Sequence, residues 1–283
     1  NIKERYDFSC AIFGPDGSLV ANAPHVPVHL GSMGETVRAV IHDKGKSLKH
    51  GDVYVTNHPH KGGSHLPDIT LVSPVMVSGE MPDFFVANRG HHADIGGTTP
   101  GSMPPNGKTI DEEGIILENI LFLRDGNYCE NEIYEKLSNG PFPARNLTER
   151  MSDLKAQSAA NLQGINGINI LVNEFSLRVV KQYMAFIRRN AAMVVSQRLL
   201  ELLNGQSELS WSYADRMDDG TIICVSMMIK KLKNKNLPVK LTVDFNGTGK
   251  QSDNNLNAPS SVTRAAVMYV LRSMLNRNIP LNS

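Results

Sequence analysis

The sequence predicts an α+β fold in which strands, long helices, further strands and a last helix follow one another along the chain. Three observations support this class. Apolar and polar residues alternate in short runs before residue 90, a helical period begins at Leu147, and alternation returns after residue 220. Because strands and helices are segregated along the chain, we expect an α+β fold rather than a doubly wound parallel sheet.

The first 145 residues are predicted to be rich in strands separated by loops of histidine, glycine and proline. A strand at 8–13 turns at Gly14-Pro15-Asp16-Gly17 into a second strand near 19–21, since Pro presets its own torsion and Gly accepts positive φ. A helix at about 31–42 and strands at 52–56, 69–77 and 84–88 follow. Residues 90–113 are rich in Gly and Pro, and a loop of this length in a compact domain is usually functional or mobile.

The remaining chain divides into two parts. Residues 146–205 are predicted to be helical, with one helix starting at 153–161, an interruption at Gly164 and Gly167, and a long helix over 174–203. In residues 206–283, strands at 221–230 and 239–245 predict a β hairpin, and 261–275 predicts a last helix. The chain opens and ends abruptly without an initiator Met, so we expect one partial domain, 1–283, truncated at both ends.

Composition excludes several classes of partner. Lys and Arg total 29 and Asp and Glu total 28, so a net charge of +1 provides no global field for nucleic acid or an anionic membrane. No apolar run approaches the roughly 18–20 residues of a membrane span. Three distant cysteines without a C-x-x-C pair favour a reducing compartment, and we expect a cytoplasmic (cytosolic) protein.

All nine histidines lie in the first 92 residues and gather in polar, glycine-rich turns. Imidazole and carboxylate groups on such turns are what a metal-assisted active site requires, because glycine lets the backbone approach an ion closely. His65-Leu66-Pro67-Asp68 is the strongest local ligand pair, although an ordinary His–Asp hydrogen bond is the alternative. The two side chains converge only if the loop curls back.

The second histidine cluster, His91-His92, follows a predicted strand. Neighbouring side chains of a strand face opposite ways, so we expect one of the two to reach a given ion. Asp94 is a candidate to orient a histidine. The other histidines are interpreted as surface or structural residues: His25, His29, His42, His50, His58 and His60.

One glycine-rich run, Gly247-Thr248-Gly249-Lys250-Gln251, superficially resembles a phosphate-binding loop. Asp244 stands where the first glycine of that pattern belongs, and Gln251 stands where the closing Ser or Thr belongs. If ATP is used, we expect it to bind elsewhere.

Several long motifs, in order along the chain, resemble the hydantoinase B family, which includes N-methylhydantoinase, acetone carboxylase and caprolactamase subunits and the C-terminal half of 5-oxoprolinase. The motifs are Arg5-Tyr6-Asp7-Phe8-Ser9-Cys10-Ala11, Pro27-Val28-His29-Leu30-Gly31-Ser32-Met33, Gly62-Gly63-Ser64-His65-Leu66-Pro67-Asp68, His91-His92-Ala93-Asp94-Ile95-Gly96-Gly97, Pro100-Gly101-Ser102-Met103-Pro104, Asp153-Leu154-Lys155-Ala156-Gln157 and Val243-Asp244-Phe245-Asn246-Gly247-Thr248. Within the family, Gly14-Pro15-Asp16-Gly17, Asn22-Ala23-Pro24-His25 and Arg89-Gly90-His91-His92 are most similar to the 5-oxoprolinase branch. Many bacterial relatives carry an acidic residue in place of His58 and an aromatic residue in place of His60, which also favours that branch.

The resemblance implies a hydantoinase B-like fold and a divalent metal, Zn or Mn or else Fe, bound by two Asp and two His. By motif these ligands are Asp7, His65, Asp68 and His91. It further implies a part, 1–145, that carries the metal site, followed by the helical and β/α parts. ATP and Mg would bind a separate hydantoinase A-like half, in the same polypeptide or a paired subunit, and the whole would form a homodimer.

The implied activity is that of an ATP-dependent cyclic amide hydrolase that opens the lactam 5-oxo-L-proline to L-glutamate in the glutathione (γ-glutamyl) cycle. This chain would hydrolyse the activated lactam, with His92, Asp94 and Glu113 as candidates for proton transfer, and would be inactive without the ATP-binding half. The alternatives are a hydantoinase or ATP-dependent carboxylase subunit, or a non-catalytic assembly subunit.

Overall fold

A seven-stranded antiparallel sheet forms the larger part of the computed structural model, which describes residues 2–23, 26–234 and 238–275. The strand order is β2-β1-β5-β4-β3-β6-β7. In chain order these strands are β1 (Phe8–Phe13), β2 (Leu19–Asn22), β3 (Val53–Thr56), β4 (Asp68–Val75), β5 (Phe84–His91), β6 (Ile120–Arg124) and β7 (Asn127–Tyr128). The strands pair antiparallel and the long helices are segregated from them, so the predicted α+β class is confirmed.

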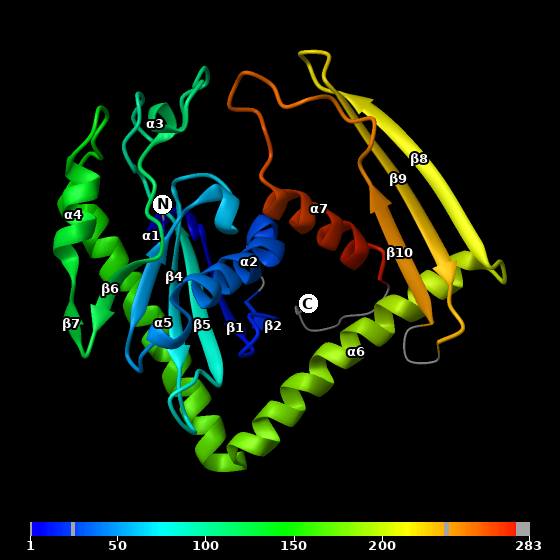
Figure 1. Ribbon diagram of the computed structural model, residues 1–283, viewed down its shortest axis with the longest axis horizontal. Coiled ribbons are helices and arrows are strands. Elements are labelled where there is room, and N and C mark those ends of the chain that lie inside the picture. The colour runs from blue at the N-terminus through cyan, green and yellow to red at the C-terminus, as the bar shows by residue number, and fades with distance from the viewer. Residues whose placement is uncertain (1, 24–25, 235–237, 276–283) are drawn as a thin grey trace.

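Helices cover both faces of this sheet (Figure 1). Helix α2 (Pro27–Lys44) packs on one face, where Phe13, Val37 and Phe85 belong to one buried apolar cluster. Helices α4 (Glu130–Ser138) and α5 (Leu147–Phe175) pack on the other face, around a cluster that includes Leu71 and Leu154. Because side chains alternate along a strand, each residue of the central strands β4 and β5 belongs to the α2 layer or the α5 layer.

Helix α5 runs without a break through Gly164 and Gly167, so the predicted interruption there is wrong. A Cβ added to Gly164 would lie 2.8 Å from Cγ1 of Val86, so this glycine lets α5 approach the sheet closely. The packing outweighs the roughly 1 kcal/mol that a glycine costs in a helix.

The break lies instead at Ser176, between α5 and α6 (Leu177–Leu203), where φ is 72°. The predicted single helix over 174–203 is therefore wrong at its start. No glycine or proline marks this junction, so the apolar period continues across it in the sequence. In Figure 1, α5 and α6 meet at a sharp angle, and α6 carries the chain away to a second sheet.

The second sheet has three antiparallel strands in the order β10-β9-β8, whereas the sequence predicts a two-stranded hairpin. These strands are β8 (Glu208–Arg216), β9 (Ile222–Lys231) and β10 (Val239–Asp244). Strand β8 is the additional strand, and its Leu209, Trp211 and Tyr213 alternate with other residues as in a strand. Leu199 and Leu203 of α6 pack with Ile229 of β9, which attaches this sheet to the helix.

Helix α7 (Ser260–Ser273) brings the chain back to the first sheet and packs against α2 (Figure 1). A Cβ on Gly31 of α2 would lie 2.5 Å from Cα of Ala265, so the two helices cross at close range. The hydroxyl of Ser261 donates to the carbonyl of Gly63 at 2.6 Å. In the loop before α7, Nδ2 of Asn255 donates to the carbonyl of Pro104 at 2.6 Å.

Two short helices complete the first part of the chain: α1 (Ile2–Arg5) and α3 (Ile110–Glu113). Two 3-10 turns, Gly45–Ser47 and Pro59–Lys61, lie in its loops. Across the described ranges, no helix is both long and apolar enough to cross a membrane.

Candidate metal centre

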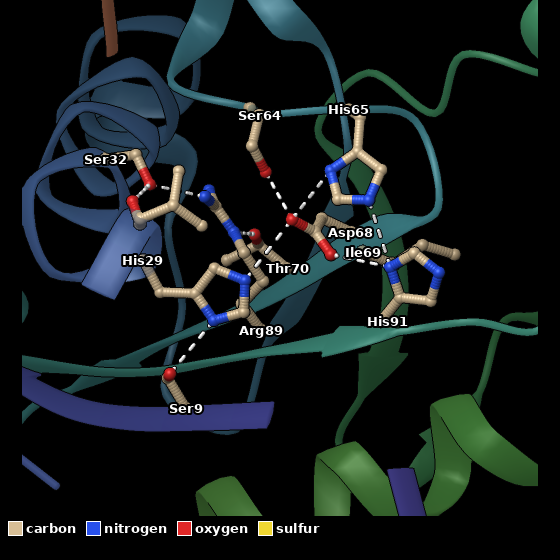
Figure 2. A network of polar contacts seen from close by, with 12 residues as sticks. Ser9, His29, Ser32, Ser64, His65, Asp68, Ile69, Thr70, Arg89 and His91 are labelled. Carbon is tan, nitrogen blue, oxygen red and sulfur yellow. Dashed lines mark hydrogen bonds and ion pairs between the residues drawn. The ribbon is translucent and has the colours of Figure 1, made fainter. Parts of the chain in front are cut away.

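The carboxylate of Asp68, the first residue of β4, lies at the centre of a cluster of three histidines and a serine (Figure 2). Its Oδ2 lies 3.2 Å from Nε2 of His29 and 3.1 Å from Nδ1 of His65. Its Oδ1 lies 3.1 Å from Nδ1 of His91. The hydroxyl of Ser64 also donates to Oδ2. Asp68 is 1% exposed, so these contacts replace the water that a carboxylate otherwise requires.

Local backbone structure brings His65 and Asp68 together. The backbone N–H of Asp68 donates to the carbonyl of His65 at 3.0 Å, which closes the tight turn that the sequence motif requires if its two side chains are to meet. His91 reaches the same point from the neighbouring strand, because it stands directly opposite Asp68 in the β4–β5 register.

One ligand atom from each of His65, Asp68 and His91 lies within 4.8 Å of the other two. Nε2 of His65 and Nδ1 of His91 are 3.1 Å apart. A tetrahedral ion with ligands about 2.1 Å away holds those ligands roughly 3.4 Å apart, so this spacing fits a bound metal. Two imidazoles and a carboxylate suit Zn²⁺, Mn²⁺ or Fe²⁺. The side chain of His65 is 39% exposed, so the cluster opens to solvent on the His65 side.

The carboxylate of Asp68 carries a negative charge at the centre of the cluster. Burial alone would raise the pKa of Asp68, but hydrogen bonds from His29, His65 and His91 hold it well below its usual range. Burial lowers the pKa of His29, so this ring is neutral near pH 7. Its Nε2–H then donates to Asp68 and its Nδ1 accepts from the hydroxyl of Ser9, at 2.9 Å. The pKa of His65 is raised: burial lowers it, but the hydrogen bond to Asp68 outweighs that effect.

A buried arginine adds a positive charge beneath the cluster. Arg89 of β5 is fully buried and stays protonated at neutral pH, since burial lowers its pKa only to about 10. Its guanidinium donates to the hydroxyls of Ser32 and Thr36 on α2, to the hydroxyl of Thr70 on β4 and to the carbonyl of Gly62. It therefore joins α2, the central strands and the loop that leads to His65.

Asp7 lies beside the cluster rather than within the 4.8 Å group. Its backbone carbonyl accepts from the N–H of His91 at 3.0 Å, at the entry to β1. Its negative charge makes a small contribution that favours the protonated forms of both His29 and His65, which opposes the lowering of the His29 pKa by burial and adds to the rise of the His65 pKa.

The three residues predicted to transfer protons occupy different places. His92 points to the opposite face of β5, where it is fully buried and contacts Oε1 of Gln157 through Nε2 at 2.9 Å. Asp94 accepts from the backbone N–H groups of Gly96, Gly101 and Arg145, so it organises the loop after β5. Glu113, at the end of α3, is half-buried. Burial raises its pKa, and the nearby charge of His65 lowers it. Of the three, Glu113 is the one whose pKa is affected by the charge of His65, whereas His92 and Asp94 hydrogen-bond to other partners.

His29 is the member of the cluster that the sequence interpretation placed among surface or structural histidines. It sits in the first turns of α2 with 1% of its surface exposed and contacts Asp68, 39 positions further along the chain. No local spacing connects the two residues. The one sequence feature that could identify His29 is its position inside a family motif, Pro27-Val28-His29-Leu30-Gly31. His25 lies outside the described residues.

Comparisons with known proteins show which sequences and folds this chain is similar to. A profile of the family described as Hydantoinase B/oxoprolinase matches residues 1–283. The chain is 45% identical over 285 residues to a 5-oxoprolinase of Dictyostelium discoideum, and the match covers 100% of this chain and 22% of that protein. It is 45% identical over 303 residues to 5-oxoprolinase 1 of Arabidopsis thaliana, covering 100% of this chain and 23% of that protein. The chain thus spans less than a quarter of the length of these relatives.

The fold is also similar to a solved structure, that of an ATP-dependent caprolactamase from Pseudomonas jessenii. The TM-score is 0.81 at 23% sequence identity, and the match covers 98% of this chain and 46% of that chain.

Proposed function

The chain belongs to the hydantoinase B/oxoprolinase family, and from that premise we propose that it carries the hydrolytic, ring-opening step of an ATP-dependent 5-oxoprolinase. The observation that supports this proposal is the buried carboxylate of Asp68, with His65 and His91 grouped around it at ligand spacing. The substrate is 5-oxo-L-proline and the product L-glutamate, a reaction of the glutathione cycle in the cytosol.

His65, Asp68 and His91 would hold a divalent ion, Zn, Mn or Fe, and Asp7 would be its fourth protein ligand. When bound, such an ion supplies Lewis acidity and lowers the pKa of a coordinated water to about 7. His29 and Ser64 orient the carboxylate of Asp68 and satisfy its remaining lone pairs. The buried charge of Arg89 balances the negative charge of Asp68.

Opening a lactam breaks a C–N bond, so the departing ring nitrogen must receive a proton. Glu113 is the residue that we propose for this transfer, because it is half-buried within electrostatic range of His65 and its pKa is raised by burial. The proton-transfer roles of His92 and Asp94 stay predictions, and their hydrogen bonds direct both side chains to other partners.

Activation of the lactam is assigned to a partner. A resonance-stabilised amide is a poor electrophile, and we propose that a hydantoinase A-like half with ATP and Mg phosphorylates the lactam oxygen and releases ADP. Addition of water to the ring carbon, cleavage of the C–N bond and departure of inorganic phosphate would then give L-glutamate. The two halves would act within a homodimer, and residues 1–283 alone would be inactive.

A second candidate substrate is another cyclic amide, because the solved structure with TM-score 0.81 is that of a caprolactamase. A panel of 5-oxo-L-proline, caprolactam, a hydantoin and a ketone with bicarbonate would separate these activities. Turnover of the ketone alone would assign the chain to a carboxylase.

The experiment that tests the proposal compares His65→Ala with His42→Ala in the protein at its natural length. His42 is a matched control, since its side chain is 88% exposed and it is not a member of the Asp68 cluster. We expect His65→Ala to lose about one equivalent of metal and to abolish glutamate formation while ATP still binds, and His42→Ala to retain all three properties. Full turnover by His65→Ala would contradict the proposal, and a folded, associating wild-type protein without metal would support an assembly role instead.

A further inference from the structure

A second polar cluster lies on the opposite face of the sheet from Asp68, in the layer of α5. Its members are buried, with exposed fractions of 3% for Asn88, 0% for His92, 5% for Gln157 and 1% for Asn161. Buried amides are costly unless they are hydrogen-bonded, and here both amides of α5 project into the sheet and not to solvent.

Gln157 makes four contacts. Its Oε1 accepts from Nε2–H of His92 at 2.9 Å. Its Nε2 donates to the carbonyl of Ile69 at 3.0 Å and to Oδ1 of Asn88 at 2.8 Å. Its backbone carbonyl accepts from Nδ2 of Asn88 at 2.6 Å. Every polar atom of this amide therefore has a partner.

Two of these partners are sequence neighbours of the candidate ligands. Ile69 follows Asp68 in β4, and His92 follows His91 at the end of β5. One side-chain amide thus ties together the two strand ends on which the carboxylate and the imidazole are mounted. The space for it is made by Gly90, where an added Cβ would lie 3.1 Å from Nε2 of Gln157.

Asn161, one helical turn further along α5, provides an internal comparison. Its Nδ2 donates to the carbonyl of Leu71 at 3.2 Å and to the hydroxyl of Ser73 at 3.0 Å. It holds the same strand in the same manner, but at residues three and five positions beyond Asp68.

We propose that Gln157 is a positioning residue of the metal centre, which sets the spacing of Asp68 and His91 from the far side of the sheet through Ile69 and His92. The inference rests on the proposed function, since it needs a metal held by Asp68 and His91. It assigns to Gln157 a role that Asn161, which is also buried and donates to Leu71 and Ser73 of β4, does not have.

The test measures Co²⁺ binding to the protein at its natural length, freed of metal, by titration and by the visible absorption spectrum of the ion. The variants are Gln157→Met, which keeps the side-chain volume without the amide, and the matched control Asn161→Leu. We expect Gln157→Met to weaken Co²⁺ binding about 10- to 100-fold and to change the spectrum, because the loss of a residue that orients metal ligands has an effect of this size. Asn161→Leu should keep the wild-type spectrum and an affinity within a few-fold of wild type.

Thermal unfolding of both variants separates a local effect from general destabilisation. Gln157→Asn is the second variant if Gln157→Met does not fold, because it retains an amide but withdraws it by one methylene. It should weaken binding in the same direction. Wild-type Co²⁺ affinity and spectrum in the Gln157 variants, or equal losses in Gln157→Met and Asn161→Leu, would overturn the inference alone. No binding by the wild-type protein would overturn the metal centre together with the inference.

Discussion

At the scale of single residues, a buried carboxylate in this protein is stabilised by donors from the adjoining loop and from a distant helix. Asp83, just before β5, accepts from the backbone N–H groups of Val77 and Ser78, each at 2.9 Å, and from Nζ of Lys181 on α6 at 2.5 Å. Burial raises the pKa of Asp83, but these donors outweigh it and lower the pKa to about 2. The carboxylate thus closes the β4–β5 hairpin and attaches it to α6.

Asp83→Asn should therefore lower the free energy of unfolding at pH 7 by about 1–2 kcal/mol. Because the folded pKa is depressed, the stabilisation is complete above the unfolded pKa of 3.8 and is lost as the pH falls toward about 2. Urea unfolding of the variant and wild type at pH 7, 4 and 2.5 should show a difference that shrinks with acid. A constant difference would contradict this, and Asp125→Asn in an exposed turn is the control.

The residues of the candidate site differ in how far the sequence predicts them. His65 and Asp68 share one turn, and His91 opposes Asp68 across one strand pair, so spacing and family motif together predict this group. Opposite directions for His91 and His92 follow from strand alternation, and the structure has them on opposite faces. His29 could not be found this way, because its contact with Asp68 depends on where α2 packs.

At the scale of elements, the existence of a helix or strand is better predicted than its ends. Helix α2 begins at Pro27, four residues before the predicted start, although proline is common in the first turn of a helix. Residues 114–146 contain β6, β7 and α4, and the sequence predicts none of these elements because no periodic run there is long. Helix propensity alone predicts a break at the two glycines of α5, whereas packing determines their effect.

Those two glycines give a direct test of the packing explanation. Gly167 has no atom within 4 Å of an added Cβ, so Gly167→Ala should stabilise the protein by up to about 1 kcal/mol. Gly164→Ala gains the same helix propensity but forces Val86 to move, so it should be less stable than Gly167→Ala by about 1–3 kcal/mol. Chemical denaturation measures both, and equal stabilities would show that α5 does not need Gly164 against the sheet.

At the scale of the whole molecule, the chain passes out along α6 to the second sheet and returns through α7 to α2 (Figure 1). The predicted succession of β-rich, helical and β/α parts matches the order of the elements, and the proposed boundaries at 145 and 205 stay predictions. The packing of α7 against α2 could not be predicted from the sequence. It brings together Gly31 and Ala265, which are far apart along the chain, and no local sequence pattern marks such a contact.

The variant Ala265→Leu tests how much the contact between α7 and α2 contributes to stability. Ala265 is 2% exposed at the closest approach to α2, so a larger side chain should push α7 away at a cost of about 1–3 kcal/mol. We expect faster amide hydrogen exchange in residues 260–273, with exchange in β4 unchanged. Val270→Leu, at a site that is 46% exposed, should leave exchange in α7 at the wild-type rate. If the α7 amides of Ala265→Leu exchanged as slowly as those of the wild type, the contact with α2 would not be what holds the helix.

The position of strand β8 also has a spectroscopic consequence. Trp211, opposite Met227 in the second sheet, is the one tryptophan among the 283 residues. Indole emission selectively excited in this chain therefore originates in a sheet that contains none of His29, His65, Asp68 and His91. Fluorescence reports the local environment of the second sheet, whereas circular dichroism averages over all the helices. The two signals together separate the loosening of that sheet from the unfolding of the part that holds the Asp68 cluster.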